Sequence, residues 1–426
     1  MTTTVGTWLD PRPPRPAEEH GVASRQPPLL SRQGAVDRPA YRALVGVLFA
    51  SIFLQRFAVP VLDTIALNLA VTTAAIALLL ARGSLLVDGR RLALFLAFAA
   101  AVMLSAARNA GEASLASTAL LCVVCAPYAL SLRASEGMFH ACLRAFQTMV
   151  LVCAWCGLAQ FILQFAIGPA GLFSFADHVP QEFLLNGFNT VIPLRWDSPI
   201  LKSNGFFFVE PSTFSQYLAL AAVFELLFRG MTARLAVYLI ALPTSFSGTG
   251  LLLLIVMIPL VLLYRRDFRA IAGLGLLGAI ALATGDFWHL DALLARTGEF
   301  GSTDSSAYAR FFAGGRLIGE FLLSSGADLA FGLGPGAFPL HAKLMPYEVH
   351  DPAWAKVLFE YGLLGTLLFW PMLLAALLAG VPSRWVGAAL LIGYFTFGGM
   401  LLDPRMQALV LVFCTLPRRR AAGLAA

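Results

Sequence analysis

Long apolar stretches, separated by short polar connectors, follow one another from residue 41 to residue 417. A helix needs roughly 17–25 mostly apolar residues to cross a bilayer, and a backbone in lipid must satisfy its hydrogen bonds internally. The pattern therefore predicts an all-α, polytopic membrane protein of about 12 transmembrane helices. The expected helices lie at 41–58, 60–81, 91–107, 114–131, 143–167, 208–228, 233–245, 250–264, 269–285, 354–379, 385–402 and 404–417.

The connectors between these stretches alternate in charge. Arg residues mark every second connector, whereas the intervening connectors are poor in charge. Because Lys and Arg accumulate on the cytoplasmic side, we expect a multi-pass protein of the cell inner membrane with both termini in the cytoplasm. The basic connectors carry Arg38 and Arg42; Arg82, Arg90 and Arg91; Arg133 and Arg144; Arg229 and Arg234; Arg265, Arg266 and Arg269; Arg384; and Arg418 to Arg420.

The composition agrees with a membrane environment. Hydrophobic residues make up 58% of the chain and charged residues 13%, with a mean hydropathy of +0.77, whereas soluble domains have about 45–50% apolar and about 25% charged residues. The formal net charge of +6 is spread over the connectors. Without a single basic face, no nucleic acid partner is predicted.

The chain is expected to divide into three segments. Residues 1–40 are rich in Pro and Arg and lack apolar periodicity, which predicts a disordered cytoplasmic tail. Residues 41–417 form one integral membrane domain, and residues 418–426 form a second cytoplasmic tail.

Two cysteine pairs, Cys122 with Cys125 and Cys153 with Cys156, have the spacing of redox or zinc sites. Both pairs lie inside apolar stretches without a nearby cluster of His or carboxylate residues, so we interpret them as small helix-packing residues. Neither a metal site nor a cofactor is predicted.

Two connectors, at about 168–207 and 286–353, are much longer than is needed to join helices. Loops beyond about 15 residues in a compact protein are usually functional. In the charge pattern both loops fall on the outer side of the membrane, and the chemistry is expected there.

The first long loop runs into a helix start at Pro211 and Ser212, two residue types that suit a first helical turn. Such a start offers free N–H groups and a positive dipole end to an anion. With Arg195 and Lys202 close by in sequence, a phosphate ligand is expected, and Glu210 would bind sugar hydroxyls or pair with a cation. The alternative is that Arg195 and Lys202 only extend toward lipid headgroups.

The second long loop carries Arg310, Arg316 and, at its end, His350. The two arginines are six residues apart and would point in different directions on one helix, so one is expected to bind ligand and the other to pair with a carboxylate. His350 can be neutral at pH 7 and accept a proton. The alternative is a hydrogen-bonding His at the membrane interface.

The same loop contains Gly332, Gly334 and Gly336 in a Gly-x-Gly-x-Gly stretch. No strand precedes it and no ribose-binding acid follows at the expected distance, which excludes a dinucleotide site. We expect a turn that brings the backbone close to a neighbour or a ligand.

Taken in order, these elements resemble the O-antigen polymerase and O-antigen ligase superfamily, called Wzy-type on the polymerase side, over roughly the C-terminal half. The Phe-Glu-Pro-Ser sequence is similar to the exopolysaccharide polymerase branch. Where this family usually has Arg the chain has Lys202, which loses bidentate phosphate geometry; Arg195 would then take over. The matching elements are Lys202 to Ser212, Thr244 to Gly250, Arg310, the stretch at Gly332, and His350 followed by Glu360 to Gly365.

The resemblance implies polymerisation of undecaprenyl-pyrophosphate-linked oligosaccharide repeat units into exopolysaccharide, by glycosyl transfer on the periplasmic face, without nucleotide or metal. The bilayer is the second partner, and chain-length regulator and flippase proteins are possible ones. The residues implied are His350 and Arg310 for catalysis, and Lys202, Arg195, Arg316 and Glu210 for substrate binding.

Two alternatives remain at this point. A ligase of the same superfamily would move the finished glycan to another acceptor. A flippase of the lipid-linked unit would instead need charges along a central cavity and an internal repeat. Before residue 168 the helices have few interior charges beyond Asp63, and no repeat is visible.

Overall fold

The computed structural model describes residues 37–59, 62–133, 136–173, 179–188, 190–194, 198–266, 268–285, 303, 305–379, 382–396 and 400–416. Most of the expected N-terminal tail and the whole C-terminal one lie outside this range. The described residues all belong to one compact unit, Gly34–Ala426.

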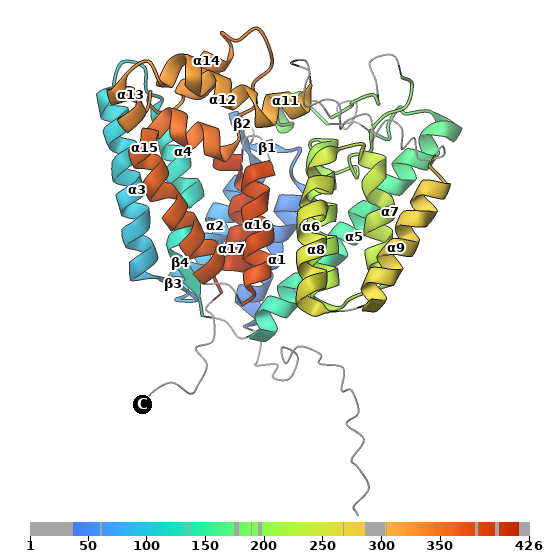
Figure 1. The fold of residues 1–426 in the computed structure, drawn as a ribbon. Helices are drawn as coiled ribbons and strands as arrows, with labels where there is room; N and C mark the ends of the chain where they lie inside the picture. The colour runs from blue at the N-terminus through green and yellow to red at the C-terminus, as the bar shows by residue number, and fades with distance from the viewer. Residues whose placement is uncertain are drawn as a thin grey trace, which may run out of the picture. The chain divides into compact units, whose positions relative to one another are not determined.

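Helices dominate this unit (Figure 1). Each expected apolar stretch contains a helix, with ends that differ by a few residues from the expected ones. These helices are α1 (Arg38–Phe53), α2 (Leu67–Ala81), α3 (Gly89–Arg108), α4 (Leu115–Cys125), α5 (Glu136–Ile167), α6 (Pro211–Phe228), α7 (Ala233–Ala241), α8 (Gly248–Arg265), α9 (Phe268–Ala283), α15 (Ala353–Leu374), α16 (Arg384–Thr396) and α17 (Pro404–Cys414).

The apolar helices fall into two length classes. Among the described residues, four helical segments are long and apolar enough to cross a bilayer alone: Gly89–Arg108, Gly137–Ile167, Gly248–Arg265 and Ala353–Ala379. Several other apolar helices are shorter, at 10–17 residues. The chain is therefore a membrane protein, and the count of 12 spans stays a prediction.

The helix expected at 60–81 is wrong at its start. Leu62–Ala66 forms the strand β2, which pairs antiparallel with β1 (Ala58–Val59). Pro60 disfavours helical geometry in the residue before it, which is consistent with the extended Val59 of β1. At the other end of the helices, β3 (Leu85–Val87) pairs with β4 (Leu130–Leu132). These two short sheets join connectors and leave the helical class unchanged.

Polar side chains fix where several helices begin. Asp88 Oδ1 accepts the amides of Arg90 and Arg91 at the start of α3, and Thr232 Oγ1 accepts the amide of Leu235 in α7. Such caps satisfy amides that have no partner within the helix.

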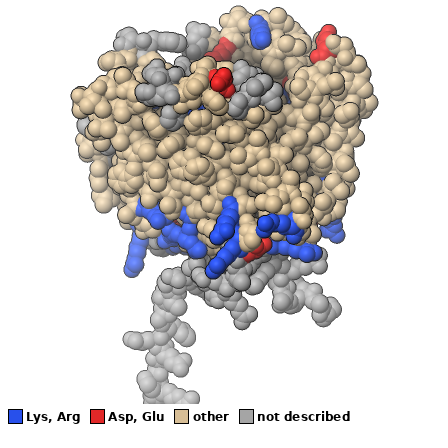
Figure 2. All heavy atoms as spheres, turned by 180° about the vertical axis from the view of Figure 1, so that it is seen from behind, with Lys and Arg blue, Asp and Glu red and all other residues tan. Residues whose placement is uncertain are grey.

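The helix α6 lies at the centre of the core, with every residue from Thr213 to Leu227 buried. It packs closely on α8, because a Cβ at Gly250 would lie 2.2 Å from the carbonyl oxygen of Ser215. Most of the Lys and Arg side chains visible in Figure 2 form a belt along one end of the unit.

A separate helical layer covers the opposite end (Figure 1). It consists of α11 (Ser306–Phe311), α12 (Ala313–Leu317), the π-helical turn η6 (Ile318–Leu322), α13 (Gly326–Phe331) and α14 (Ala337–Ala342), and we call this layer the cap. Its small apolar core includes Leu317, Leu322 and Phe338 from the cap and Phe359 from α15. The cap thus rests on the first turns of α15.

Candidate functional site

The end of the second long loop is held against α11. The backbone amide of His350 donates to the carbonyl oxygen of Ala309, at 3.1 Å. This bond brings His350 beside Arg310, the next residue of α11. The His350 ring Nε2 lies 3.4 Å from Oε1 of Glu348, which is largely exposed.

The charges around His350 include a group from the first long loop. Burial lowers the pKa of His350 below its ordinary value, and the positive charge of Arg310 lowers it further. The carboxylates of Glu348, Glu210 and Asp351 oppose this shift without reversing it. Since an ordinary His has a pKa of about 6.5, the ring is neutral at pH 7. Two other predicted site residues, Arg310 and Glu210, therefore lie within electrostatic reach of His350.

Glu210 is held at the start of α6. It is the residue before the first helical turn, and its Oε2 accepts a hydrogen bond from Ser212 Oγ at 2.8 Å. Immediately before it the chain turns sharply at Gly205 and Phe206, which have φ values of +61° and +67°. A left-handed Phe costs of order 1–3 kcal/mol and persists only where its surroundings impose it.

Helix α5 imposes this turn through two buried amide side chains. Gln160 Oε1 accepts the backbone amides of Asn204 and Phe206, each at 3.2 Å. Gln164 Oε1 accepts the amide of Leu201 at 2.8 Å. The segment that leads to Glu210 is thus attached to a long helix, and the position of the carboxylate is fixed.

The sequence did not identify Arg405, at the start of α17. Its Nε donates to Asp403 Oδ1 at 2.8 Å, and its Nη1 donates to Thr213 Oγ1 at 3.1 Å and to Gln55 Oε1 at 3.4 Å. One guanidinium therefore joins the end of α1, the start of α6 and the start of α17 beside Glu210. An ionisable residue at the edge of an apolar stretch was the signal that could have found it.

Arg56, in the connector after α1, was also missed. Only 4% of its surface is exposed, and burial lowers its pKa to about 10. Its Nη1 donates to the carbonyl oxygens of Phe173 and Phe206, at 3.3 Å each, and Nη2 donates to Thr190 Oγ1 at 3.2 Å. Arg56 thus holds three parts of the first long loop together.

The glycine stretch attaches the cap to α15. The amides of Leu333 and Gly334 donate to the carbonyl oxygens of Phe359 and Glu360, at 3.0 Å each. These carbonyls precede a break in α15 at Gly362, where φ is +63° and ψ is −165°. The expectation of a turn that brings the backbone close to a neighbour or a ligand is confirmed, and the neighbour is the backbone of α15.

A buried cation links this region to the residue after His350. Lys356 Nζ lies 2.8 Å from Asp351 Oδ2 and 3.8 Å from Glu360 Oε1. Glu360 in turn accepts the backbone amide of Phe338, at 3.3 Å. Asp351 is therefore anchored to α15, and with it the end of the loop.

The remaining predicted residues are Arg316, Lys202 and Arg195. Arg316 lies exposed on α12. The amide of Lys202 donates to the carbonyl oxygen of Ile192, in the turn closed by the Pro193–Leu201 bridge. Arg195 lies outside the described residues.

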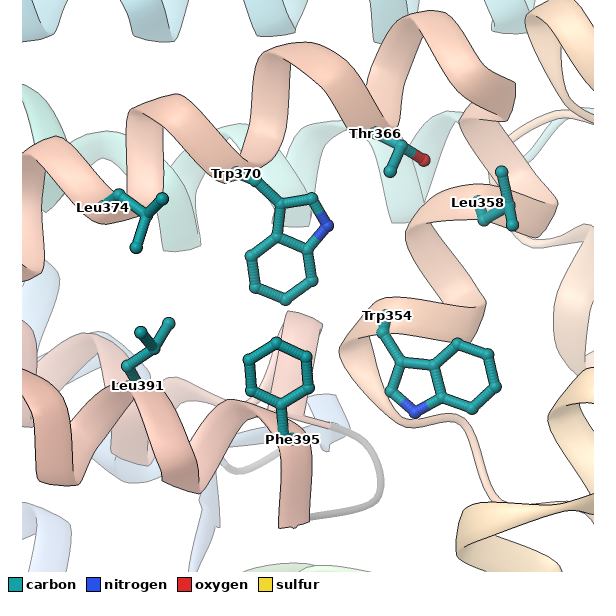
Figure 3. Close-up of a pocket in the computed structure, with 7 residues that line it drawn as sticks. All are labelled: Trp354, Leu358, Thr366, Trp370, Leu374, Leu391 and Phe395. Carbon is teal, nitrogen blue, oxygen red and sulfur yellow. The ribbon is translucent and has the colours of Figure 1, made fainter.

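An apolar groove of about 480 Å³ lies between α15 and α16. Figure 3 shows its lining residues, with Trp354 at the end nearest the cap loop in sequence. The rings of Trp370 and Phe395 stack across it, with centroids 5.0 Å apart. The hydroxyl of Thr366 is satisfied, because it donates to the carbonyl oxygen of Gly362 at 2.7 Å. Leu358, Leu374 and Leu391 complete the lining.

All six cysteines are free thiols. Within the described ranges, no group of three or more His, Cys, Asp or Glu residues could hold a metal ion.

Comparison with known proteins identifies a family. The family model described as WcaD colanic acid polymerase matches residues 44–335, which include Glu210 and Arg310 but end before His350 and Arg405. No curated protein and no solved structure matches the chain.

Proposed function

The chain belongs to the WcaD colanic acid polymerase family, and from this we propose that it polymerises undecaprenyl-pyrophosphate-linked oligosaccharide repeat units into exopolysaccharide. The reaction is a glycosyl transfer on the periplasmic face of the inner membrane. The observation that supports the proposal is that His350 is bonded to Ala309, beside Arg310, and lies within electrostatic reach of Glu210 at the start of α6.

The chemistry follows from these side chains. An acceptor hydroxyl oxygen forms a bond to the anomeric carbon of the donor, and the bond from that carbon to the pyrophosphate oxygen breaks. The electron pair leaves with the pyrophosphate, where Arg310 stabilises the developing negative charge. Neutral His350 accepts the proton of the acceptor hydroxyl, and Glu210 binds sugar hydroxyls.

Further cations would hold the donor before it reacts. Lys202 and Arg195 are proposed to bind the pyrophosphate from the first long loop. The pyrophosphate carries several negative charges, which favours more than one cation in the site beside Arg310.

The groove between α15 and α16 suits the polyprenyl tail of the donor. It is lined almost wholly by apolar side chains, and its Trp354 end lies four residues from His350. A tail in this groove would place the attached pyrophosphate near the cap while the lipid stays in the bilayer.

The orientation is proposed from the belt of Arg residues, which would face the cytoplasm with both termini. Arg265 Nη1 donates to the carbonyl oxygens of Leu226 and Leu227, so the ends of α6 and α8 lie together.

We further propose that the shorter apolar helices also cross the membrane, giving 12 spans. A cysteine at the exposed Arg266 should be labelled only after permeabilisation, and labelling in intact spheroplasts would contradict the orientation.

The glycan profile of a deletion strain tests the function. A polymerase predicts single repeat units on the lipid acceptor, whereas a ligase predicts long chains left on undecaprenyl pyrophosphate. A flippase predicts repeat units that stay inaccessible from outside. Restoration by the wild-type chain, but not by His350→Ala at equal protein level, completes the test.

A further inference from the structure

Three aromatic side chains form a cluster on the outer surface of the cap. The rings of Tyr308 and Phe312 stack with centroids 6.0 Å apart and an interplanar angle of 21°. The ring of Tyr347 meets Tyr308 edge-on, with centroids 5.4 Å apart. Tyr308 is buried and supports the other two, while Phe312 is 50% exposed. We call these three residues the aromatic platform.

Charged groups border the aromatic platform. Arg316 and Glu320, both exposed, lie close enough to Tyr347 for their charges to act on its hydroxyl. Within the described part of the chain, the Arg316 side chain makes no hydrogen bond or ion pair with another residue. Its donors are therefore available to a ligand that contacts the platform.

Tyr308 lies on α11, the helix that holds His350, and Phe312 follows the last residue of this helix. The amide of His350 donates to Ala309, between Tyr308 and Arg310 in α11. In α12, a Cβ at Gly314 would lie 2.9 Å from Ala355 and 3.8 Å from the Trp354 ring. Since six helical residues span about 9 Å, the platform is one or two sugar residues away from His350.

We propose that the aromatic platform binds pyranose residues of the growing glycan, one or two sugars from the reacting hydroxyl. The apolar C–H face of a pyranose packs on an aromatic ring, and its hydroxyls accept and donate hydrogen bonds at Arg316 and Glu320. Bound there, the acceptor stays near His350 between successive additions. The platform thereby favours long chains. This inference rests on the proposed polymerase function.

The test compares Phe312→Ala and Tyr347→Ala with Leu344→Ala. Leu344 is 68% exposed on the same outer segment and serves as the matched control. Aromatic contacts contribute about 0.5–1.5 kcal/mol, so each platform variant should raise the acceptor KM about 2- to 10-fold. Polymer should be shorter, while kcat at saturating acceptor stays within twofold of wild type. Tyr347→Phe, which retains the ring, should keep most of the chain length.

Binding is measured with the lipid-free repeat-unit oligosaccharide on the full-length protein in detergent. Weaker binding by Phe312→Ala and by Phe312→Leu supports the proposal. Phe312→Leu keeps an apolar side chain and serves as the test if Phe312→Ala fails to fold. Wild-type chain length and oligosaccharide affinity in both variants would overturn it, as would loss of membrane insertion alone, which indicates a lipid-interface role. If the wild-type protein itself joins no lipid-linked repeats, the proposed function fails instead.

Discussion

Replacing Gly332 by Ala tests whether the glycine stretch positions the site through α15. The added Cβ would lie 2.3 Å from the carbonyl oxygen of Glu360 and 2.4 Å from the amide nitrogen of Tyr361, at a φ of +80°. With ψ at 175°, this is a backbone conformation that essentially only Gly adopts, so Ala there costs of order 1–3 kcal/mol, and forcing a methyl group into packed backbone adds about 1–3 kcal/mol. We therefore expect Gly332→Ala to destabilise the protein by about 2–6 kcal/mol.

Gly326→Ala is the matched control, because nothing lies within 4 Å of the Cβ it would add at the start of α13. There the reduced freedom of the unfolded chain should stabilise by about 0.4–1 kcal/mol. The assay is the apparent unfolding temperature in detergent, with polymer yield at matched protein level. The control should match or exceed wild type, and Gly332→Ala should lose both stability and polymer. Equal unfolding temperatures and equal polymer in the two variants would refute the reasoning.

Four further outcomes are expected. His350→Ala and His350→Gln should insert stably and lose about 10²- to 10⁴-fold in turnover, measured by elongation of lipid-linked repeats; wild-type yield from the Gln variant would exclude a base. Because burial and Arg310 lower the pKa of His350, wild-type activity should persist below pH of about 6.5 and fall only as pH drops through the lowered pKa. The carboxylate of Glu348 raises the pKa of His350, an interaction worth about 0.2–1 kcal/mol. Glu348→Gln should therefore move the acid limb of the pH–rate profile down by about 0.1–0.7 pH unit. A move upward would contradict the assignment. Arg310→Ala should abolish polymer and Arg310→Lys should keep a little, since charge remains without the planar fork; normal polymer from the Ala variant in the same assay would disprove the pyrophosphate role. Arg405→Met should destabilise the protein by about 3–5 kcal/mol, because it leaves the charge of Asp403 uncompensated. The double variant Arg405→Met with Asp403→Asn should recover stability. Equal thermal unfolding of the single and double variants would argue against the ion pair.

Local signals were sufficient for most of the helices and for the start of α6. Apolar stretches of membrane length are recognisable from neighbouring residues, and Pro211 with Ser212 marks a first helical turn. The glycine stretch was predicted to bring the backbone close to a neighbour or a ligand, because its sequence context fits no nucleotide site. What the sequence lacked was the identity of that neighbour, since Gly332 and Glu360 meet only in the folded chain.

The polar groups around Arg405 could not be predicted in the same way. Its partners Thr213 and Gln55 are 192 and 350 residues away in sequence. A single charged residue such as Arg405 does not disrupt the apolar pattern of its helix. Hydropathy also does not show which helix ends its side chain contacts. The strand at Leu62–Ala66 was missed because Asp63 and Thr64 are only a short polar interruption between apolar residues.

The contacts of Arg56 have a consequence for how the chain is made. Arg56 leaves the ribosome 117 residues before Phe173 and 150 residues before Phe206, whose carbonyl oxygens it binds in the finished protein. At about 5–20 residues per second, synthesis of that interval takes roughly 6–30 s. Throughout this time the guanidinium must remain hydrated, because its acceptors do not yet exist. The contacts of the connector after α1 therefore form late in synthesis. In a nascent chain that ends before Phe206 they are incomplete, and the connector is accessible to membrane proteases.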